Sequence, residues 1–387
     1  MFDIIISNFG FWINFLIPVA VAIFLLISHK EFVTKEFFMQ FGITIIYTLT
    51  MFFLLFSFST DLVDREYWNG KVSKFVWEEE WTEEVTYYEE VCTGSGEKRS
   101  CHTVTKTRNE YHPNYYYIKT SNGERISISS SEWRTASREF GKKKNFLYRM
   151  NQVSYGDGNE FISTPNIVIP TSVSHSYNNY VVASKLNVLN ENVSKKELDI
   201  LVLNKLLPEP PKLYEGEYGE TKLNRIIDMT NSFDTSKMLK ELDLFSAKYG
   251  KEKQVNPIIV ITNQGREFKR NLAAYWKNAE KNEAVLLLGV NGSKIVWSDV
   301  ITWTKEMRFV EILKSSFKDL DLKKDSDKVL NIFTKNIIKE YVRQPMEDFA
   351  YLKENITLKW YWQLFIILGN LVLSFFSLRY FLTNRNF

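Results

Sequence analysis

The sequence has little cysteine and little histidine, with two and four of these residues among its 387. Sites built on a cysteine or histidine nucleophile, or on zinc, draw on these residue types, so tertiary structure would have to assemble such a site from isolated residues. The chain also lacks a GxxxxGK[ST] phosphate-binding loop, a GxGxxG dinucleotide fingerprint and a GxSxG nucleophile elbow. These absences leave the chain without a motif for the common nucleotide-dependent enzymes or serine hydrolases.

The chain has no strong excess of charge of either sign, since 49 Lys and Arg against 46 Asp and Glu give a net charge of +3. Nucleic-acid-binding domains carry basic stripes, often interleaved with aromatic residues. The basic residues here are scattered, and the one tight cluster is the lysine triplet at 142–144. Such a short triplet is typical of a solvated loop. The sequence therefore predicts no nucleic-acid partner.

Three long runs, at residues 4–28, 37–60 and 360–378, contain no charged residue and are rich in apolar residues. A helix needs about 20 such residues to cross the hydrocarbon core of a bilayer. The first run is too long for a signal peptide, and no Lys or Arg precedes it. We therefore expect three transmembrane helices, with the lipid bilayer as a partner of the chain.

These runs contain no Asp, Glu, Lys, Arg or His, and their amide side chains include Asn14 and Asn370, with Gln40 and Gln363 near the ends of their runs. Transport proteins place ionisable groups deep in the membrane. The asparagines are better interpreted as hydrogen-bonding partners between helices. A channel or transporter component built as a homo-oligomer stays a third functional hypothesis.

Basic residues indicate how the chain is oriented in the membrane. Lys30 and Lys35 lie in the loop between the first two runs, and Arg379 and Arg385 lie in the C-terminal tail, whereas the N-terminal segment has no basic residue. The positive-inside rule places basic loops in the cytoplasm. We therefore expect an integral protein of an inner or plasma membrane, with a cytoplasmic loop and C-terminus and a large extracytoplasmic domain.

Cys92 and Cys101 flank a segment of turn-forming residues, and aromatic and β-branched residues precede and follow them. This pattern predicts a β-hairpin in which the cysteines face each other. A disulfide closing so small a loop would stabilise the fold by roughly 2 to 3 kcal/mol in an oxidising compartment.

Direct pairing of the cysteines would also place Glu83 and Glu89 on the same face of the hairpin as Lys106 and Arg108. Two alternatives stay open, namely free thiols and a zinc site made of Cys92, Cys101, His102 and His112. Structural zinc ligands usually come in pairs spaced by two to five residues, which this sequence does not offer.

Residues 61–150 read as a β-rich subdomain with a tight turn at Asn122-Gly123 and a short helix within 133–150. Residues 151–219 read as a connector that is irregular over 154–179 and contains one helix, which Ser194 opens with a capping-box spacing.

Residues 220–350 show the most regular order of elements. A helix begins near 234 with Gly250 as its stop signal, and strand 255–262, helix 266–280 and strand 284–290 follow. Asn291-Gly292 predicts a hairpin into strand 293–303, and helices follow at 307–317 and 325–341. The sequence predicts an α/β sandwich with helices covering a small sheet.

Five segments of this region resemble the TPM domain. They are RIID at 225–228, KYG at 248–250, IIVIT at 258–262, AYW at 274–276 and KNEAVLLLGV at 281–290. The resemblance covers residues 220–342 and implies a membrane-anchored, extracytoplasmic domain. The wider chain is also similar to uncharacterised membrane proteins of bacteria and their phages.

The resemblance also implies a candidate cation site, because some TPM relatives are described as phosphatases or as cation binders through acidic loops. Where the family shows Asp-Asn-Gly, this chain reads Asn-Glu-Ala at 282–284, and residues 297–300 lack the glycine pair of the family. Asp228, Glu283 and Asp299 are the candidate ligands for a divalent cation, which prefers several oxygen ligands from converging loops. The alternative is that Asp228 caps or turns the chain and that the other two carboxylates are solvated.

These observations define six regions: two transmembrane helices within 1–60 joined by a cytoplasmic loop, the β-rich subdomain 61–150, the connector 151–219, the TPM-like domain 220–350, a transmembrane helix within 358–380 and a cytoplasmic tail 381–387. We expect a non-enzymatic protein, with no cofactor required, that presents its extracytoplasmic domain to other membrane or envelope proteins. The alternative is a membrane-anchored, metal-assisted phosphatase or other hydrolase of TPM type.

Overall fold

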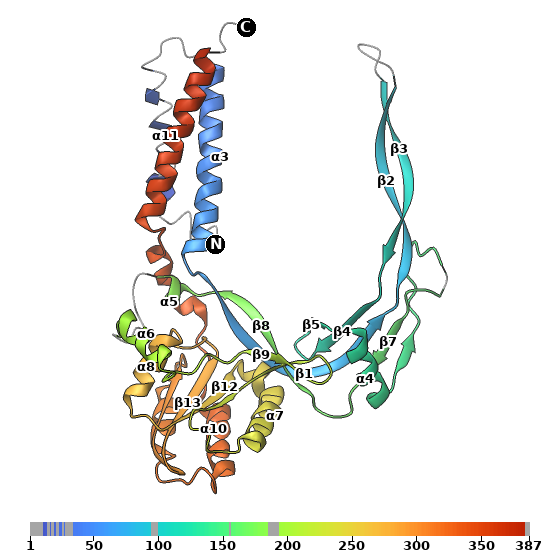
Figure 1. Ribbon diagram of the computed structural model, residues 1–387. Helices are drawn as coiled ribbons and strands as arrows, with labels where there is room; N and C mark the ends of the chain where they lie inside the picture. The colour runs from blue at the N-terminus through green and yellow to red at the C-terminus, as the bar shows by residue number, and fades with distance from the viewer. Residues whose placement is uncertain are drawn as a thin grey trace. The chain divides into compact units, whose positions relative to one another are not determined.

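The computed structural model describes residues 11–13, 16, 19, 20, 23, 24, 27, 34–93, 100–154, 156–184 and 193–383 (Figure 1). Contacts divide the chain into two compact units. The helical unit comprises Met1–Arg65, Ser176–Asn192 and Gln344–Phe387, and the α/β unit comprises Glu66–His175 and Val193–Arg343. Both the predicted β-rich subdomain and the predicted α/β domain fall largely in the α/β unit.

The helical unit contains two long apolar helices, α3 (Thr34–Ser59) and α11 (Trp360–Thr383). Among the described residues, the stretches Phe38–Ser59 and Trp360–Ser377 are long and apolar enough to cross a membrane. Only 22% and 17% of the residues in their most apolar windows are buried, whereas a core helix of a soluble protein is mostly buried. Most of the described residues of the first predicted span, 4–28, are exposed and all are helical, and the rest of that span lies outside the described residues.

A polar seam joins α3 to α11. Asn370 donates a hydrogen bond from Nδ2 to Oγ1 of Thr48 over 2.8 Å, and the Ser377 hydroxyl donates to Oε1 of Gln40. The sequence-based interpretation that Asn370 joins helices is therefore confirmed, while Asn14 lies outside the described residues. Gly369 lies against the ring of Tyr47, so a side chain at this position would collide with the phenol.

Two short helical segments complete the described part of the helical unit. They are α5 (Tyr180–Ala183) and the 3-10 helix η2 (Met346–Asn355). Asn179 caps α5 by accepting hydrogen bonds at Oδ1 from the backbone of Val181 and Val182, and its own backbone N–H donates to the carbonyl of Leu62.

A four-stranded sheet forms the C-terminal half of the α/β unit, in the order β11 (Ile226–Asp228), β12 (Asn256–Thr262), β13 (Glu283–Asn291) and β14 (Lys294–Thr302). The first three strands are parallel, and β14 is antiparallel to β13. All residues of β12 are buried, as expected for a parallel strand that is covered on both faces.

Helices cover both faces of this sheet (Figure 1). One hydrophobic core joins the sheet to α7 (Ser236–Lys253), α9 (Met307–Ser315) and α10 (Ser326–Glu340). A second core joins the other face to α6 (Lys195–Leu203) and α8 (Glu267–Tyr275). The predicted order of strands and helices, the α/β class and the Asn291-Gly292 turn are all confirmed, with Gly292 at φ 61°.

The sequence predicted that Gly250 ends a helix, and this prediction is wrong. Helix α7 continues to Lys253, and Gln254 provides the left-handed cap at φ 49°. A Cβ atom at position 250 would collide with the side chain of Asn69. The glycine is therefore required for close packing against another segment and does not terminate the helix.

A second sheet occupies the N-terminal half of the α/β unit. Its strands follow the order β5 (Arg125–Ser127), β4 (Tyr115–Thr120), β1 (Val63–Glu78), β7 (Glu160–Ser163) and β6 (Lys143–Asn145), and β8 (Pro170–Asn178) also pairs with β1. The predicted Asn122-Gly123 turn joins β4 to β5, with Gly123 at φ 92°.

Two predictions for this half are corrected by the structure. The expected helix within 133–150 is α4 (Ser130–Phe140), which a capping box at Ser129 opens and which ends before Gly141. Residues 154–179 are not irregular throughout, because they contain β7 and β8. These strands are short or polar, so they carry little of the hydrophobic alternation that marks a strand. A separate two-stranded sheet pairs β9 (Leu213–Glu215) with β10 (Thr221–Leu223).

Candidate functional site

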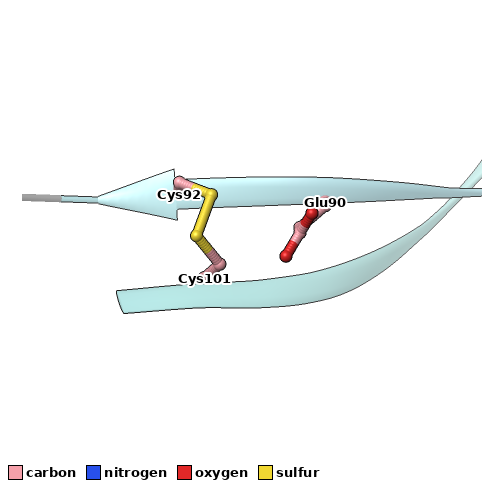
Figure 2. Close-up of side chains that lie close together, drawn as sticks. All are labelled: Glu90, Cys92 and Cys101. Carbon is pink, nitrogen blue, oxygen red and sulfur yellow. A yellow bond between two sulfur atoms is a disulfide. The ribbon is translucent and has the colours of Figure 1, made fainter. Parts of the chain in front are cut away.

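A long β-hairpin is the most unusual surface feature of the α/β unit. Strands β2 (Trp81–Thr93) and β3 (Ser100–His112) have 13 residues each and pair along their whole length. Cys92 lies directly opposite Cys101, and their sulfur atoms are 2.06 Å apart (Figure 2). The predicted hairpin and the direct pairing of the two cysteines are therefore confirmed.

Charged pairs add to the register of the hairpin. The Lys106 ammonium lies 2.6 Å from the Glu89 carboxylate, as the shared face predicts, and Glu89 raises the pKa of Lys106. Glu83 does not contact Arg108. It lies 2.9 Å from Nε2 of His112, while Arg108 donates to Glu110 of its own strand. The register explains this difference, because Glu83 lies opposite Glu110 and not opposite Arg108. Glu83 therefore contacts His112, and Glu110 contacts Arg108.

Both faces of the hairpin are open to solvent along most of its length, with alternate residues such as Tyr88 exposed by 76%. Its base is anchored, since Trp81 stacks on His112 with ring centroids 4.4 Å apart and the Arg149 guanidinium lies 4.5 Å from the Trp81 ring. An isolated two-stranded hairpin is marginally stable in water. The anchored base and the disulfide near the tip stabilise the ribbon at both ends.

The described residues contain one group of potential metal ligands within 4.8 Å of one another, namely Glu90, Cys92 and Cys101. Figure 2 shows Glu90 beside the disulfide. Because the two sulfurs are bonded to each other, they do not offer thiolate ligands. His102 is opposite Val91, and His112 lies at the other end of the hairpin. The four residues of the zinc alternative are therefore not gathered at one place.

Asp228 lies at the carboxyl end of β11 and organises the loop that follows. Its Oδ1 accepts from the backbone N–H and the hydroxyl of Thr230, and its Oδ2 accepts from the backbone N–H groups of Ser232 and Phe233, each over 3.0 Å. Four donors therefore occupy the carboxylate. This arrangement matches the alternative in which Asp228 turns the chain.

Glu283 and Asp299 lie elsewhere on the sheet. Glu283 is buried at the amino end of β13, where its Oε1 accepts from Nδ2 of Asn256 over 3.1 Å. Asp299 lies on β14 and accepts from the Lys269 ammonium over 2.9 Å. The structure does not bring Asp228, Glu283 and Asp299 together, and neither Glu283 nor Asp299 is simply solvated.

A buried polar cluster, which sequence analysis missed, is centred on Arg225, of which 2% is exposed. Its Nε donates to Asp243 over 2.9 Å, and its terminal nitrogens donate to Asn69, Ser172 and Asn256. Burial lowers the pKa of Arg225 and raises the pKa of Asp243. The cluster connects β1 and β8 of the N-terminal sheet with β12 of the four-stranded sheet and with α7, which packs on the four-stranded sheet.

A second buried cluster is centred on Glu66, whose exposure is 1%. Nη2 of Arg343 donates to both carboxylate oxygens over 2.7 and 2.6 Å, and the Trp68 indole donates to Oε1 over 2.9 Å. Trp68 also stacks on His175, with ring centroids 3.8 Å apart. Glu66, His175 and Arg343 are the residues of the α/β unit at three places where the chain passes between the units.

A cavity of about 180 Å³ shares one lining residue with each of these clusters. It is lined by Tyr67, Trp68, Asn69, Asn122, Gly250, Lys251, Gln254 and Asn282. The Oδ1 atoms of Asn122 and Asn282 are buried without a hydrogen-bond partner. Neutral amides and aromatic rings dominate this lining, and it contains no carboxylate for acid–base or metal chemistry.

No protein-family model matches this sequence, and comparison with curated proteins and with solved structures gives no match either. The resemblance to the TPM domain therefore stays a prediction.

Proposed function

We propose that this protein is an integral membrane protein that presents its α/β unit on the extracytoplasmic side and docks on other membrane or envelope proteins through the β2–β3 hairpin. Its role is to hold a partner, with no chemical step. The observation that carries this proposal is the hairpin, because it is long and anchored at its base, and most of both its faces is left open to solvent.

The composition of the hairpin suits a protein partner. One face carries Thr86, Tyr88, Thr105 and Thr107, a row of β-branched and aromatic side chains that fits a flat protein surface. The edge of β2 is occupied at its base, where Thr82 and Glu84 form backbone hydrogen bonds with residues 151–153. Beyond this base the strand edges can offer backbone groups to an added strand, which is a common mode of peptide recognition. Charged residues along both strands limit unspecific pairing of such edges.

Two observations support the extracytoplasmic side. Disulfides persist in oxidising compartments and are rare in the cytosol, and the only two cysteines of the chain are bonded to each other. The basic residues of the short loop and the tail are those that the positive-inside rule keeps in the cytoplasm.

A photocrosslinking amino acid tests the docking role in native membranes. Placed at Tyr88 or at Thr105 on the same face, it should give an adduct of one size with a protein partner. The matched control at Val296, an exposed residue of β14, should not give this adduct. The combined Cys92→Ser and Cys101→Ser variant should weaken the adduct, because the end of the hairpin loses its crosslink.

Adducts of equal yield at all three positions, or adducts with lipid alone at Tyr88 and Thr105, would contradict the proposal. A purified full-length protein that hydrolysed a generic phosphoester in a cation-dependent manner would favour the hydrolase alternative instead.

A further inference from the structure

A segment just after α4 exposes basic and apolar side chains side by side. Lys142, Lys143 and Lys144 are all exposed, and the apolar side chains Phe146, Tyr148 and Met150 are exposed by 76%, 82% and 78%. We call these six residues the basic–aromatic strip. Residues 141–150 contain no Asp or Glu.

Exposure alternates along residues 146–150. Phe146, Tyr148 and Met150 are exposed, while Leu147 and Arg149 between them are partly buried. Arg149 is held inward by its contacts with the Gly158 carbonyl and the Trp81 ring. In an extended segment, successive side chains point to opposite sides. Phe146, Tyr148 and Met150 are thus three large apolar side chains left open to solvent within five residues, which is unusual at a protein surface.

More hydrogen-bond donors lie beside the strip. A hollow of about 520 Å³ is lined by Arg134, Arg138 and Lys142 with Trp133 and the hydroxyl residues Ser131, Thr135 and Ser137. The charged groups of this lining are all cations. The indole N–H of Trp133 is buried without a hydrogen-bond partner.

The carboxylates of this region are engaged with other groups. Glu139 accepts from the Tyr218 hydroxyl over 2.6 Å, and Glu132 accepts from the backbone of Ser129 in the capping box. Glu160 accepts from Asn145 over 3.2 Å and lies 3.6 Å from Lys74. Hydrogen bonds from neutral donors leave the carboxylates of Glu132 and Glu139 charged. The lysine triplet 142–144 with Arg134 and Arg138 supplies five cations, which outnumber these two carboxylates, so this surface is positive.

We propose that the basic–aromatic strip and the adjoining face of α4 bind the surface of a bilayer that contains anionic phospholipids. Lysines attract the negative surface, and aromatic rings and a methionine enter the boundary between headgroups and acyl chains. The donors of the hollow suit the phosphate of a headgroup. The chain also has two helices that are long and apolar enough to cross a membrane, which agrees with a role at a lipid surface.

Flotation with liposomes tests this binding. Full-length protein in nanodiscs of neutral phosphatidylcholine is mixed with liposomes of phosphatidylcholine alone or with added phosphatidylglycerol. Replacing Lys142, Lys143 and Lys144 by Gln should reduce the partition coefficient for the anionic liposomes about a hundredfold at low salt, since each basic residue near the surface contributes about 1 kcal/mol. The control variant Lys323→Gln, Lys324→Gln, Lys328→Gln changes the net charge equally and should bind as the unaltered protein does.

Insertion is measured on the variant Met150→Cys, whose free thiol carries a polarity-sensitive dye because the two native cysteines are bonded to each other. The dye emission should shift to the blue with anionic liposomes only, and the same dye at Val296→Cys should not shift. Combined Phe146→Ser and Tyr148→Ser should abolish this shift.

Equal binding of neutral and anionic liposomes, or equal loss of binding in the two lysine variants, would overturn the proposal. A dye shift at Met150→Cys that RNA or an acidic protein produces without liposomes, and that anionic liposomes do not produce, would overturn it as well.

Discussion

Arg225 shows how a single charged residue organises the α/β unit. It is buried among Asp243, Asn69, Asn256 and Ser172, which belong to different elements of the fold. An unpaired buried charge is costly, whereas a paired one is tolerated when its remaining donors are satisfied. Arg225 therefore constrains how the two sheets meet.

The variant Asp243→Asn should lower the free energy of unfolding by about 3 to 5 kcal/mol, because it leaves the guanidinium buried without its countercharge. Replacing both partners, as Arg225→Met with Asp243→Leu, should recover a large part of this loss. Thermal unfolding of the full-length protein in detergent, followed by tryptophan fluorescence, measures both effects.

Asp327→Asn is the matched control, because it removes the carboxylate of an ion pair with Lys237 that is open to solvent. It should change the unfolding temperature little. A loss in Asp243→Asn no greater than in this control would show that the buried pair does not stabilise the fold.

The disulfide could be predicted from the sequence, whereas the buried Arg225 cluster could not. Cys92 and Cys101 were predictable because turn residues lie between them and strand-forming residues surround them, so the information is local. Arg225 finds its partners 18 to 156 positions away, and no local pattern marks such a residue as buried. Asp228 looked like a cation ligand, yet its oxygens accept from the backbone of its own loop.

Helices α3 and α11 approach each other closely at Gly369 of α11, which leaves room for the Tyr47 side chain of α3. Gly369 faces the Tyr47 ring, whereas Gly42 in α3 has open space where a side chain would lie. Small residues let membrane helices approach closely. Substituting Gly369 tests the close packing, whereas substituting Gly42 tests only the effect of glycine on helix propensity.

Gly369→Ala should destabilise the protein by about 1 to 3 kcal/mol through overpacking against Tyr47. Gly42→Ala should leave stability unchanged or raise it, because alanine favours a helix over glycine. The unfolding temperature in detergent distinguishes the two. Combining Gly369→Ala with Tyr47→Ala should restore part of the loss, and equal effects of the two glycine variants would count against the close contact.

The sequence predicted elements best where their pattern is strongest. The strands β12 and β13 are continuous apolar runs, and α7 to α10 have clear helical spacing, so their order was read correctly. β7 was missed because it has only four residues, and β8 was missed because most of its residues are polar and it begins at Pro170. These strands exist because β1 provides their hydrogen-bonding partner, which is a tertiary effect that a local pattern does not contain.

At the scale of the whole molecule, the sequence predicted apolar helices at both ends around a large polar middle, but it did not predict that Ser176–Asn192 belongs to the helical unit. Each unit is assembled from separate stretches of the chain. Local composition does not show which distant stretches pack together. The apolar runs were evident from sequence, since α3 and α11 are long and free of charge over most of their length.

The orientation in the membrane can be measured with single cysteines. In intact cells, an impermeant maleimide should label Val296→Cys in the α/β unit but should label Thr383→Cys at the end of α11 only after permeabilisation. The disulfide-bonded pair does not react without a reductant, so the introduced thiol is the one labelled. Labelling of Thr383→Cys in intact cells with protection of Val296→Cys would reverse the proposed topology.

The contact between Glu66 and Arg343 has a consequence for biosynthesis, because the two residues are separated by 277 positions. A ribosome that adds about 5 to 20 residues per second makes the acid roughly 15 to 55 s before the arginine. During that interval the Glu66 carboxylate cannot accept hydrogen bonds from Arg343. The two hydrogen bonds from Arg343 to the Glu66 carboxylate therefore form only after residue 343 has been made, and until then Lys281, 4.0 Å from the carboxylate in the fold, is one of the basic groups that can balance its charge.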